Sequence, residues 1–392
     1  MRRATIDPQN DPRAGYGTVG ERVLITGGAG FVGSHLADAL AAAGYEVVLF
    51  DNLEPQVHGA SERPAYLDPH HQLVRGDIRD PHALAPLVGD AHVIFHLAAM
   101  VGVGQSMYQV RRYTDVNAMG MASLLEVLAE QRGRVRKLVV ASSMSIYGEG
   151  AYTCTSCGRL APRLRPAAQL QQGDWEMRCP RCLASLTPVP TDEDKPLYPT
   201  SIYAINKRDH EEMALAFGHA YDLPTVALRF FNIYGSRQAL SNPYTGVAAI
   251  FCGRMLEGQP PVIYEDGRQT RDFVHVSDIV QACVLAMSNA AADYQVLNVG
   301  TGRPISVLEV AAVLARALQC EAQPVITHQF RAGDIRHCYA DISRIRQLLG
   351  YEPRAAFADG VNELIAWVTA QRRLNAAVPD AHAQLAAYGL VR

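Results

Sequence analysis

The sequence predicts an α/β fold built on a doubly wound parallel sheet. From Glu21 onward, short and nearly all-apolar runs alternate with helical stretches, and a glycine-rich turn follows the first run. Apolar runs of this kind are typical of strands that are covered on both faces. The 392 residues are enough for two lobes. The net charge is -3 and 19% of the residues are charged, so the chain has no positive electrostatic field that would attract nucleic acid or an anionic membrane.

The predicted elements follow one another in a regular order. RVLITG is the first strand, FVGSHLADALAAAG is a helix that ends at Gly44, and YEVVLFD is the second strand. Further strands are predicted at 91–99 and 136–143, with helical segments near 82–88 and 114–132. Another helix begins in SIYAINK and continues to about residue 220. After about residue 235 the pattern loosens, which favours a smaller α/β substrate-binding lobe.

A cofactor site is predicted where the first strand meets its helix. TGGAGFVG places Gly27, Gly30 and Gly33 at this turn, where the backbone must bend sharply and approach a pyrophosphate at the helix N-terminus. A tight turn alone would also require glycine. However, the second strand ends in Asp51, and a carboxylate there accepts hydrogen bonds from ribose hydroxyls and repels a 2′-phosphate. We therefore expect a Rossmann-type domain that binds NAD in preference to NADP.

Four further residues carry groups suited to catalysis or cofactor binding. Asp77 of RGDIRD is placed to meet the adenine amine, or else it starts a turn or helix. Tyr203 and Lys207 are four residues apart on one helix face, where a lysine near a positive nicotinamide favours the tyrosine phenolate. A surface helix with an incidental Tyr and Lys is the alternative. Ser143, which ends a strand, offers a hydroxyl to the same substrate oxygen.

These motifs, in this order, resemble the extended short-chain dehydrogenases/reductases, and within them the NAD-dependent nucleotide-sugar epimerase/dehydratase group. The quoted segments, with HLAA, LRFFNIYG, RQTRDFVHVSDI and RAGDIRH, span about Val23 to residue 366. The resemblance implies a catalytic triad of Ser143, Tyr203 and Lys207. It implies cofactor contacts from Gly27, Gly30, Phe31, Val32, Gly33, Asp51, Asn52, Asp77, Ile78, Leu97, Ala98, Ala99, Asn117, Tyr203, Lys207 and Phe231. It implies substrate contacts from Ser143, Ser145, Asn232, Arg271, Arg331 and Asp334, with the arginines on the diphosphate.

The residues that follow Ser143 favour one reaction of this group. Dehydratases of the group carry an Asp-Glu pair there, and decarboxylating members keep the Glu. This chain has Met144 and Ser145, neither of which can exchange protons with C5 or C6. The resemblance therefore implies 4-epimerisation of a nucleotide-activated (deoxy)hexose by transient oxidation at C4. A dehydratase or decarboxylase is the enzymatic alternative, and a nucleotide sensor without catalysis is another. Thymine and uracil both remain open as the base.

Four of the eight cysteines form two C-x-x-C pairs, which predict a structural zinc site. An iron–sulfur cluster or two redox disulfides are the alternatives. The pairs lie between Ser143 and Tyr203, so we expect an insertion at the mouth of the sugar pocket that acts as a lid or wall. The segment resembles the zinc ribbon of members such as the dTDP-L-rhamnose 4-epimerases. Its arginines have few aromatic neighbours, so no nucleic acid is expected. The predicted ligands are Cys154, Cys157, Cys179 and Cys182.

Domain limits, location and assembly complete the expectations. No run of 18 apolar residues and no signal peptide is visible, so no membrane association and a cytoplasmic location are expected. The resemblance implies a homodimer formed through the helices near 114–132 and 202–220. The predicted divisions are a flexible tail at 1–20, a Rossmann domain at 21–150 with 191–235 and about 274–300, a zinc ribbon at 151–190, and a sugar-nucleotide lobe at about 236–273 with 301–392.

Overall fold

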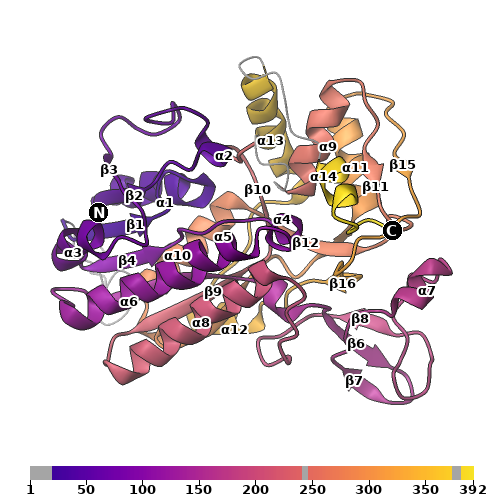
Figure 1. Cartoon of the computed structure of the whole chain (residues 1–392), viewed down its shortest axis with the longest axis horizontal. Helices are drawn as coiled ribbons and strands as arrows, with labels where there is room; N and C mark the ends of the chain where they lie inside the picture. The colour runs from indigo at the N-terminus through magenta and orange to yellow at the C-terminus, as the bar shows by residue number, and fades with distance from the viewer. Residues whose placement is uncertain (1–19, 241–245, 373–380) are drawn as a thin grey trace, which may run out of the picture.

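The computed structural model describes residues 20–240, 246–372 and 381–392. Residues 1–19 of the predicted tail therefore lie outside the described residues. Figure 1 shows a large sheet with its helices at the left, a smaller lobe at the upper right and the insertion at the lower right.

The large sheet has seven strands in the order β13-β9-β5-β4-β1-β2-β3, and every neighbouring pair is parallel. The register places Thr26 level with Phe50 on one side and with His96 on the other. The carboxyl ends of these strands therefore lie at one edge of the sheet. The strands are β1 (Arg22–Thr26), β2 (Glu46–Asp51), β3 (Gln72–Arg75), β4 (Val93–His96), β5 (Lys137–Ser143), β9 (Thr225–Phe230) and β13 (Val296–Val299).

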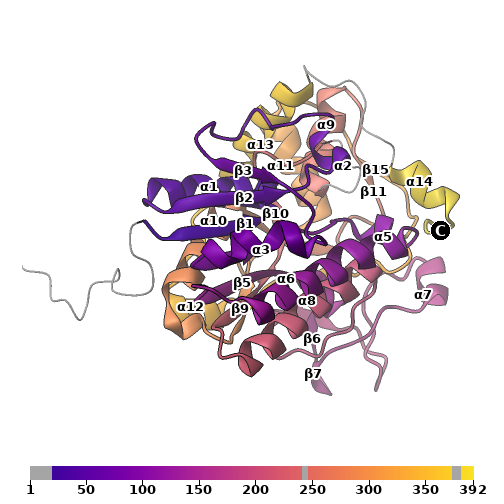
Figure 2. The same cartoon turned by 60° about the vertical axis from the view of Figure 1, so that its left-hand side comes forward.

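Helices cover both faces of this sheet, as the fold class requires (Figure 2). Because successive side chains on a strand point to opposite faces, Val23 and Ile25 enter one apolar core while Leu24 enters the other. Helices α6 and α8 lie side by side in both views. The first core contains residues of α1 (Phe31–Ala42), α10 (Val276–Ser288) and α12 (Ser343–Leu349), and the second contains residues of α3 (Pro81–Asp90), α6 (Gly120–Glu130) and α8 (Ile202–Ala220).

The single helix predicted at 114–132 is wrong in detail. The chain forms α5 (Val110–Thr114), a π-helical turn η1 (Asp115–Met119) and then α6. The wider turn accommodates Asn117, whose side-chain oxygen accepts a hydrogen bond from the Met100 amide at 2.8 Å and whose amide donates to the Met100 carbonyl at 3.2 Å. Turns of this type occur frequently at functional sites.

The smaller lobe packs three helices beside a four-stranded sheet. Its core joins α9 (Val247–Leu256), α11 (Val307–Ala317) and α13 (Phe357–Arg372). One assignment differs from the predicted division: Ile345 and Leu349 of α12 pack in the core of the large sheet and not in the lobe, because α12 lies against β13. The lobe strands are β10 (Asn232–Tyr234), β12 (Thr270–His275), β14 (Pro304–Ser306) and β16 (His337–Cys338), with β11 (Val262–Ile263) and β15 (Val325–Ile326) paired separately.

The insertion is a small three-stranded antiparallel sheet with β6 (Ala151–Cys154) between β7 (Gly158–Leu160) and β8 (Thr187–Val189), accompanied by the short helix α7 (Ala167–Gln171). Ala151 pairs with Val189, so the two ends of the insertion lie next to each other. Its buried core is small, which indicates that apolar burial contributes little to its stability. The buried core residues are Tyr152, Cys154, Met177, Cys179 and Leu186.

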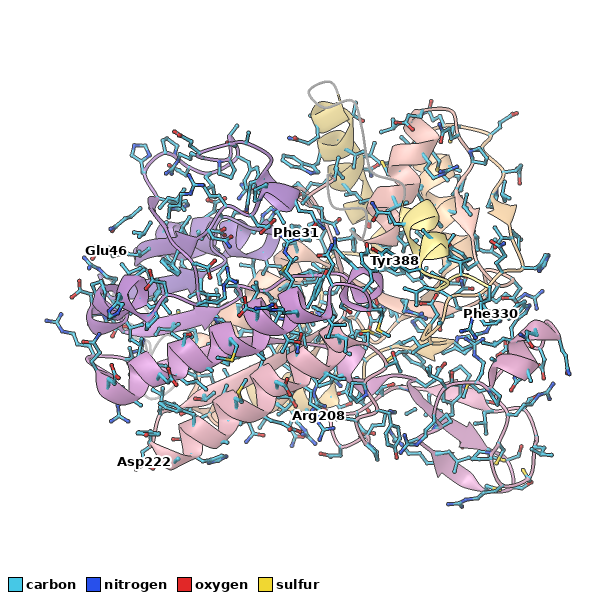
Figure 3. The ribbon with its side chains drawn as sticks, in the orientation of Figure 1. Phe31, Glu46, Arg208, Asp222, Phe330 and Tyr388 are labelled. Carbon is cyan, nitrogen blue, oxygen red and sulfur yellow. The ribbon has the colours of Figure 1, made fainter. Side chains whose placement is uncertain are left out.

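The described C-terminal residues connect the two lobes. Tyr388, just after α14 (Ala381–Ala387), stacks on Tyr108 with ring centroids 4.3 Å apart. Arg392 exchanges two backbone hydrogen bonds with Phe330, of 2.9 and 3.0 Å. Figure 3 labels Phe330 and Tyr388 on this side of the molecule. The remaining short elements are α2 (Pro55–His58), α4 (Val103–Ser106), η2 (Met144–Tyr147) and η3 (Ala290–Ala292). Among the described helices, none combines the length and the hydropathy that a membrane span needs.

Candidate functional site

The glycine turn is held tightly between the ends of β2 and β4. The Gly27 amide donates to the Phe50 carbonyl at 2.8 Å. A Cβ on Gly27 would lie 2.7 Å from the Ala98 backbone nitrogen, and its φ of +68° is in the left-handed region. Gly30 precedes α1 and provides no side-chain cap, so the first-turn amides of α1, next to Phe31 and Val32, remain available for an anion.

Asp51 lies at the end of β2 and contacts the same turn. Its Oδ2 accepts a hydrogen bond from the Ala29 amide at 3.0 Å, and its Oδ1 accepts one from the Leu53 amide at 2.9 Å. Burial raises the pKa of Asp51, and the hydrogen bond from Leu53 opposes that shift. The carboxylate therefore fixes the path of the chain on both sides of the predicted ribose position, while each oxygen keeps one lone pair.

The structure shows the hydrogen bonds of Asp77 and the helix cap that follows it. Asp77 accepts a hydrogen bond from the Arg79 amide at 3.0 Å, as in a turn, and the helix cap of α3 is Asp80. The hydrogen bond from the Arg79 side chain lowers the pKa of Asp77 to about 2. Asn52 donates to Asp77 at 3.4 Å. Ile78 is buried where α6 begins. Asp77 therefore lies in a turn, as one of the two interpretations predicts. It also lies next to Asn52, and its contact with the adenine amine stays a prediction.

The remaining predicted cofactor residues gather at the same edge of the sheet. Leu97 donates its amide to the Thr26 carbonyl at 3.1 Å, and Ala98 and Ala99 follow directly after β4. Asn117 is fully buried beside Met100, as described above. Phe231 is buried between β9 and β10.

The structure brings Ser143, Tyr203 and Lys207 together. Ser143 ends β5, and α8, which carries Tyr203 and Lys207 one turn apart, packs on that strand. The Ser143 side chain is near enough to Tyr203 to lower the pKa of its hydroxyl. Ser143 Oγ also accepts from Ser145 Oγ at 3.0 Å, and Lys207 Nζ donates to the Ala141 carbonyl at 2.9 Å.

Burial dominates the electrostatics of this group. It raises the pKa of Tyr203 to about 12, which the Ser143 side chain partly offsets. It lowers the pKa of Lys207 to about 7. From the sequence we expected Lys207 to lower the pKa of Tyr203. In the structure, burial is the largest influence on both groups and the ammonium is directed to the Ala141 carbonyl, so a lowered pKa of Tyr203 beside a bound nicotinamide stays a prediction.

Two buried histidines beside Lys207 were not identified from the sequence. His96 Nδ1 lies 2.9 Å from Thr26 Oγ1, His210 Nε2 lies 3.0 Å from the Asn117 carbonyl oxygen, and their ring centroids are 5.1 Å apart. Burial lowers the pKa of His96 to about 3 and that of His210 well below its usual range, so both rings are neutral. The available signal was His96 in the quoted HLAA motif.

Four of the predicted substrate residues, Asn232, Arg271, Arg331 and Asp334, lie on the lobe side, whereas Ser143 and Ser145 lie at the end of β5. Asn232 Oδ1 is buried without a hydrogen-bond partner, as expected of a group that receives a ligand. Arg271 Nη2 donates to the Ile335 carbonyl at 2.7 Å. Arg331 Nε donates to Asp334 Oδ2 at 2.7 Å. The Thr200 hydroxyl donates to the Gly333 carbonyl at 3.1 Å, which links this segment to the chain just before α8.

The four predicted metal ligands converge. Their sulfur atoms all lie within 4.8 Å of one another, and Cys154 Sγ is 3.5 Å from Cys182 Sγ. Each C-x-x-C turn closes through a left-handed residue, Gly158 with φ +75° and Leu183 with φ +62°. The converging cysteines are Cys154, Cys157, Cys179 and Cys182.

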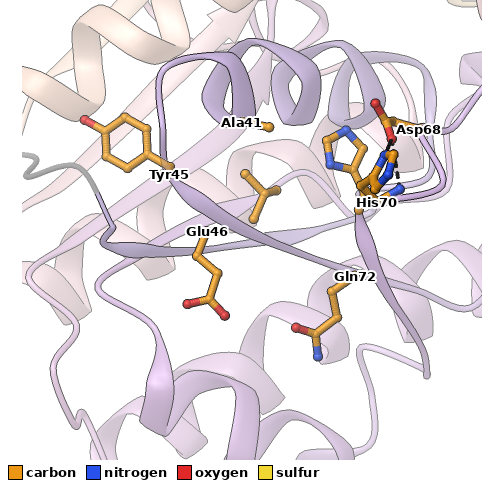
Figure 4. A pocket seen from close by; sticks show the side chains of 8 residues that line it. Ala41, Tyr45, Glu46, Asp68, His70 and Gln72 are labelled. Carbon is orange, nitrogen blue, oxygen red and sulfur yellow. Dashed lines mark hydrogen bonds and ion pairs between the residues drawn. The ribbon is translucent and has the colours of Figure 1, made fainter.

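A surface pocket of about 340 Å³ lies elsewhere (Figure 4). Tyr45, Glu46 and Gln72 line it at the amino ends of β2 and β3. Asp51 is at the opposite end of β2, so this pocket does not belong to the site described above.

These features define a Rossmann-type dinucleotide-binding protein with a Ser-Tyr-Lys group at the edge of its sheet. The chain belongs to the NAD dependent epimerase/dehydratase family, whose model matches residues 23–166 and 182–300. The interval between the two matched parts lies inside the insertion.

Proteins of known activity are similar over most of this chain. A dTDP-L-rhamnose 4-epimerase from Burkholderia thailandensis is 34% identical, over 89% of this chain and 95% of its own length. A UDP-glucose 4-epimerase from Thermotoga maritima, solved with UDP-glucose, has a TM-score of 0.73 at 30% identity, covering 89% of this chain and 99% of that chain. The UDP-glucose 4-epimerase of Thermus thermophilus, solved with NAD, has a TM-score of 0.68 at 29% identity, covering 89% and 99%. These relatives are nucleotide-sugar 4-epimerases, which are isomerases.

The glycine turn generates a stability prediction. Gly27→Ala should destabilise the protein by about 2 to 4 kcal/mol, because it adds left-handed strain to an overlap with Ala98. Gly59→Ala is the matched control, since Gly59 has φ +64° and open space around it, and it should cost only about 1 kcal/mol. Urea unfolding measures both. Equal losses would contradict the close approach to β4.

Proposed function

We propose that this protein is an NAD-dependent 4-epimerase that acts on a nucleotide-activated (deoxy)hexose linked to dTDP or UDP. The observation that carries the proposal is the Ser143, Tyr203 and Lys207 group, placed at the edge where the NAD-binding turn lies, with Met144 and Ser145 following. This group supplies one general base and no second proton carrier. The 4-epimerase relatives support the same reaction.

The chain's own residues handle one proton in each half-reaction. Tyr203, as the phenolate, takes the proton from the C4 hydroxyl and later returns it to the oxygen at C4. Ser143 holds that same oxygen by a hydrogen bond, since its hydroxyl already lies against Tyr203. Between the halves, the keto-sugar turns its other face to the cofactor while the diphosphate stays bound. The glycine turn and Asp51 would hold NAD, which would supply the acceptor and donor of the hydride at C4.

Residues of the chain fit both ligands. The uncapped start of α1 and the Asp51 carboxylate suit the pyrophosphate and ribose of NAD. On the lobe side, the buried and unpaired Asn232 oxygen suits a sugar or cofactor donor. Arg271 and Arg331 suit the diphosphate of the substrate, which we assign to the smaller lobe that contains α9, α11 and α13.

Two alternatives have specific weaknesses. A 4,6-dehydratase needs an Asp-Glu pair at the two positions after Ser143, and a decarboxylase needs the Glu at the second of them, where this chain has Met144 and Ser145. A sensor without catalysis would not need Tyr203 and Lys207 buried beside Ser143, because burying both costs free energy.

We also propose a structural zinc ion in the insertion. A tetrahedral zinc site with Zn–S bonds of about 2.3 Å places its sulfurs about 3.8 Å apart, close to the arrangement of the four cysteines. Four thiolates leave no open coordination position, so the metal holds the fold of the insertion and takes no part in the reaction. A reducing compartment such as the cytoplasm keeps these thiols available.

We further propose a homodimer. Val110 on α5, Met119 on η1 and Ile205 on α8 are exposed by 45%, 55% and 42%. These apolar side chains lie on the adjacent helices that the resemblance assigns to a four-helix interface, and pairing would cover them.

Product analysis tests the proposed function. Incubation with dTDP- and UDP-hexoses, followed by NMR, should give the C4 epimer of one of them. Tyr203→Phe should lower turnover by about 100-fold or more while bound NAD stays in place, because only the proton acceptor is lost. A 4-keto-6-deoxy sugar or released carbon dioxide as main product would refute 4-epimerisation, and an unchanged Tyr203→Phe rate would refute the triad.

The pH profile tests the role of Lys207. Burial places the pKa of Tyr203 at about 12, so a neighbouring positive charge must lower it for the phenolate to form near neutral pH. In Lys207→Ala the acid limb of the kcat/KM profile should move to higher pH. The value of kcat/KM at pH 7 should then fall about tenfold for each pH unit of that movement. Arg208→Ala, an exposed neighbour paired with Glu212, should leave the limb in place. An unmoved limb in Lys207→Ala would contradict the assignment.

Metal analysis tests the zinc proposal. The purified protein should contain one zinc per chain, and Cys179→Ser/Cys182→Ser should lose it, keep NAD, and raise KM more than it lowers kcat. Cys320→Ser, outside the cluster, should keep the metal. Iron, or no metal at all, would refute zinc.

A further inference from the structure

The insertion extends one arginine into the smaller lobe. The Arg165 side chain is 1% exposed. Its two terminal nitrogens donate to the two oxygens of Glu265 at 2.9 and 2.8 Å, and one of them reaches the Asp334 carbonyl at 3.4 Å. Parallel hydrogen bonds of this kind fix direction as well as distance.

A second connection runs from the lobe into the insertion. Arg336 is fully buried and donates to Glu176 of the insertion at 2.6 and 3.1 Å. It also donates to Glu265 at 2.9 Å and to Asp266 at 2.7 and 3.0 Å. We call Arg165, Glu176, Glu265, Asp266 and Arg336 the buried charge network.

The network constrains geometry more than it adds stability. Buried charges that lose a partner are strongly unfavourable, whereas a complete set gains little over apolar packing. Arg336 and Glu265 must therefore keep their partners. The insertion and residues 331–337 consequently move as one unit. Glu149, at the start of the insertion, reinforces this by accepting hydrogen bonds from the Arg336 and His337 amides at 2.6 and 3.3 Å.

Residues 331–337 in turn hold the proposed diphosphate ligands. Arg331 and Asp334 belong to this segment. Arg271 comes from β12, but its Nη1 donates to the Arg336 carbonyl at 3.0 Å and its Nη2 to the Ile335 carbonyl at 2.7 Å. The direction of the Arg271 guanidinium therefore depends on where this segment lies.

We propose that Arg165 and Glu176 of the insertion are positioning residues for the substrate diphosphate. They hold residues 331–337 in place and, through the carbonyls of that segment, orient Arg271. This inference rests on the proposed function, because it assumes that a sugar nucleotide binds at these arginines. On this proposal the metal-binding insertion supports the lobe that binds the diphosphate.

Calorimetric binding of dTDP and UDP to the NAD-loaded, zinc-loaded protein tests the proposal. Arg165→Met keeps most of the side-chain volume and removes the hydrogen bonds. It should raise the Kd of the tighter nucleotide about tenfold or more, and raise KM while kcat changes less than about threefold. Glu176→Gln, at a half-exposed position, should raise the same Kd by a smaller factor and avoids any folding defect of the first variant. NAD and zinc contents should stay unchanged in both.

Arg178→Met is the matched control. Arg178 lies in the same insertion, but its ion pair is with Asp174 of the insertion itself, at 3.1 Å. Because such exposed pairs contribute little, its loss should alter the nucleotide Kd by less than about twofold. An effect as large as that of Arg165→Met would mean that general loosening of the insertion, and not the network, governs binding, and would overturn the proposal.

A double-mutant cycle separates the network from the metal. Cys179→Ser/Cys182→Ser should raise the nucleotide Kd in the otherwise unchanged protein. In an Arg165→Met background the same change should raise the Kd by less than about threefold further, because both changes act through one connection. Full additivity, or an unchanged Kd in both Arg165→Met and Glu176→Gln, would overturn the positioning role. Failure of the unchanged protein to bind either nucleotide would overturn the proposed function itself, and this inference with it.

Discussion

Parallel pairing of β1 with β2 and β4 is the constraint on which the rest of the molecule depends. Because all three strands run in one direction, their carboxyl ends meet at one edge, and the chain must cross the sheet by helices to return. Those crossings create the two apolar cores. The shared edge then collects Asp51, the glycine turn and Ser143 from segments far apart in the sequence. The smaller lobe and the insertion both attach beyond this edge.

Local patterns were enough to predict the strands β1, β2, β4 and β5, the helices α1, α3, α6 and α8 and the cofactor turn, whereas β9, β13, α10 and α12 were not predicted. Apolar runs mark buried strands, and glycines at a strand end mark a close approach, as the contact between Gly27 and Ala98 illustrates. The π-helical turn at η1 was missed, because no glycine or proline marks it and its cause is the contact of Asn117 with Met100. The packing of α12 on the large sheet was also missed, because the residues that Ile345 contacts come from distant parts of the sequence.

The charged residues were the hardest to interpret from the sequence. The sequence shows Arg165 only as one of several arginines in the insertion, and nothing near it indicates that its side chain is almost completely buried. Its partner Glu265 is 100 positions away, and no local pattern links the two. The converging cysteines were predicted because C-x-x-C spacing is itself a local signal. The proposed roles of the site residues could be predicted from their chemistry and from their place at one edge of the sheet. The residues that hold them in position could not be predicted, because those contacts form only in the tertiary structure.

The paired ends of the insertion have a consequence for how such proteins diverge. Since Ala151 and Val189 are strand partners, a lineage can gain or lose the whole segment between them without rethreading the sheet that carries Ser143 or the helix that carries Tyr203. Such a change is not neutral elsewhere, however. Glu265 would lose Arg165 and keep Arg336 alone, and Arg336 would lose Glu176, so two buried charges would each lack one of their partners, which is unfavourable. The presence of the insertion and the identity of residue 265 should therefore be inherited together.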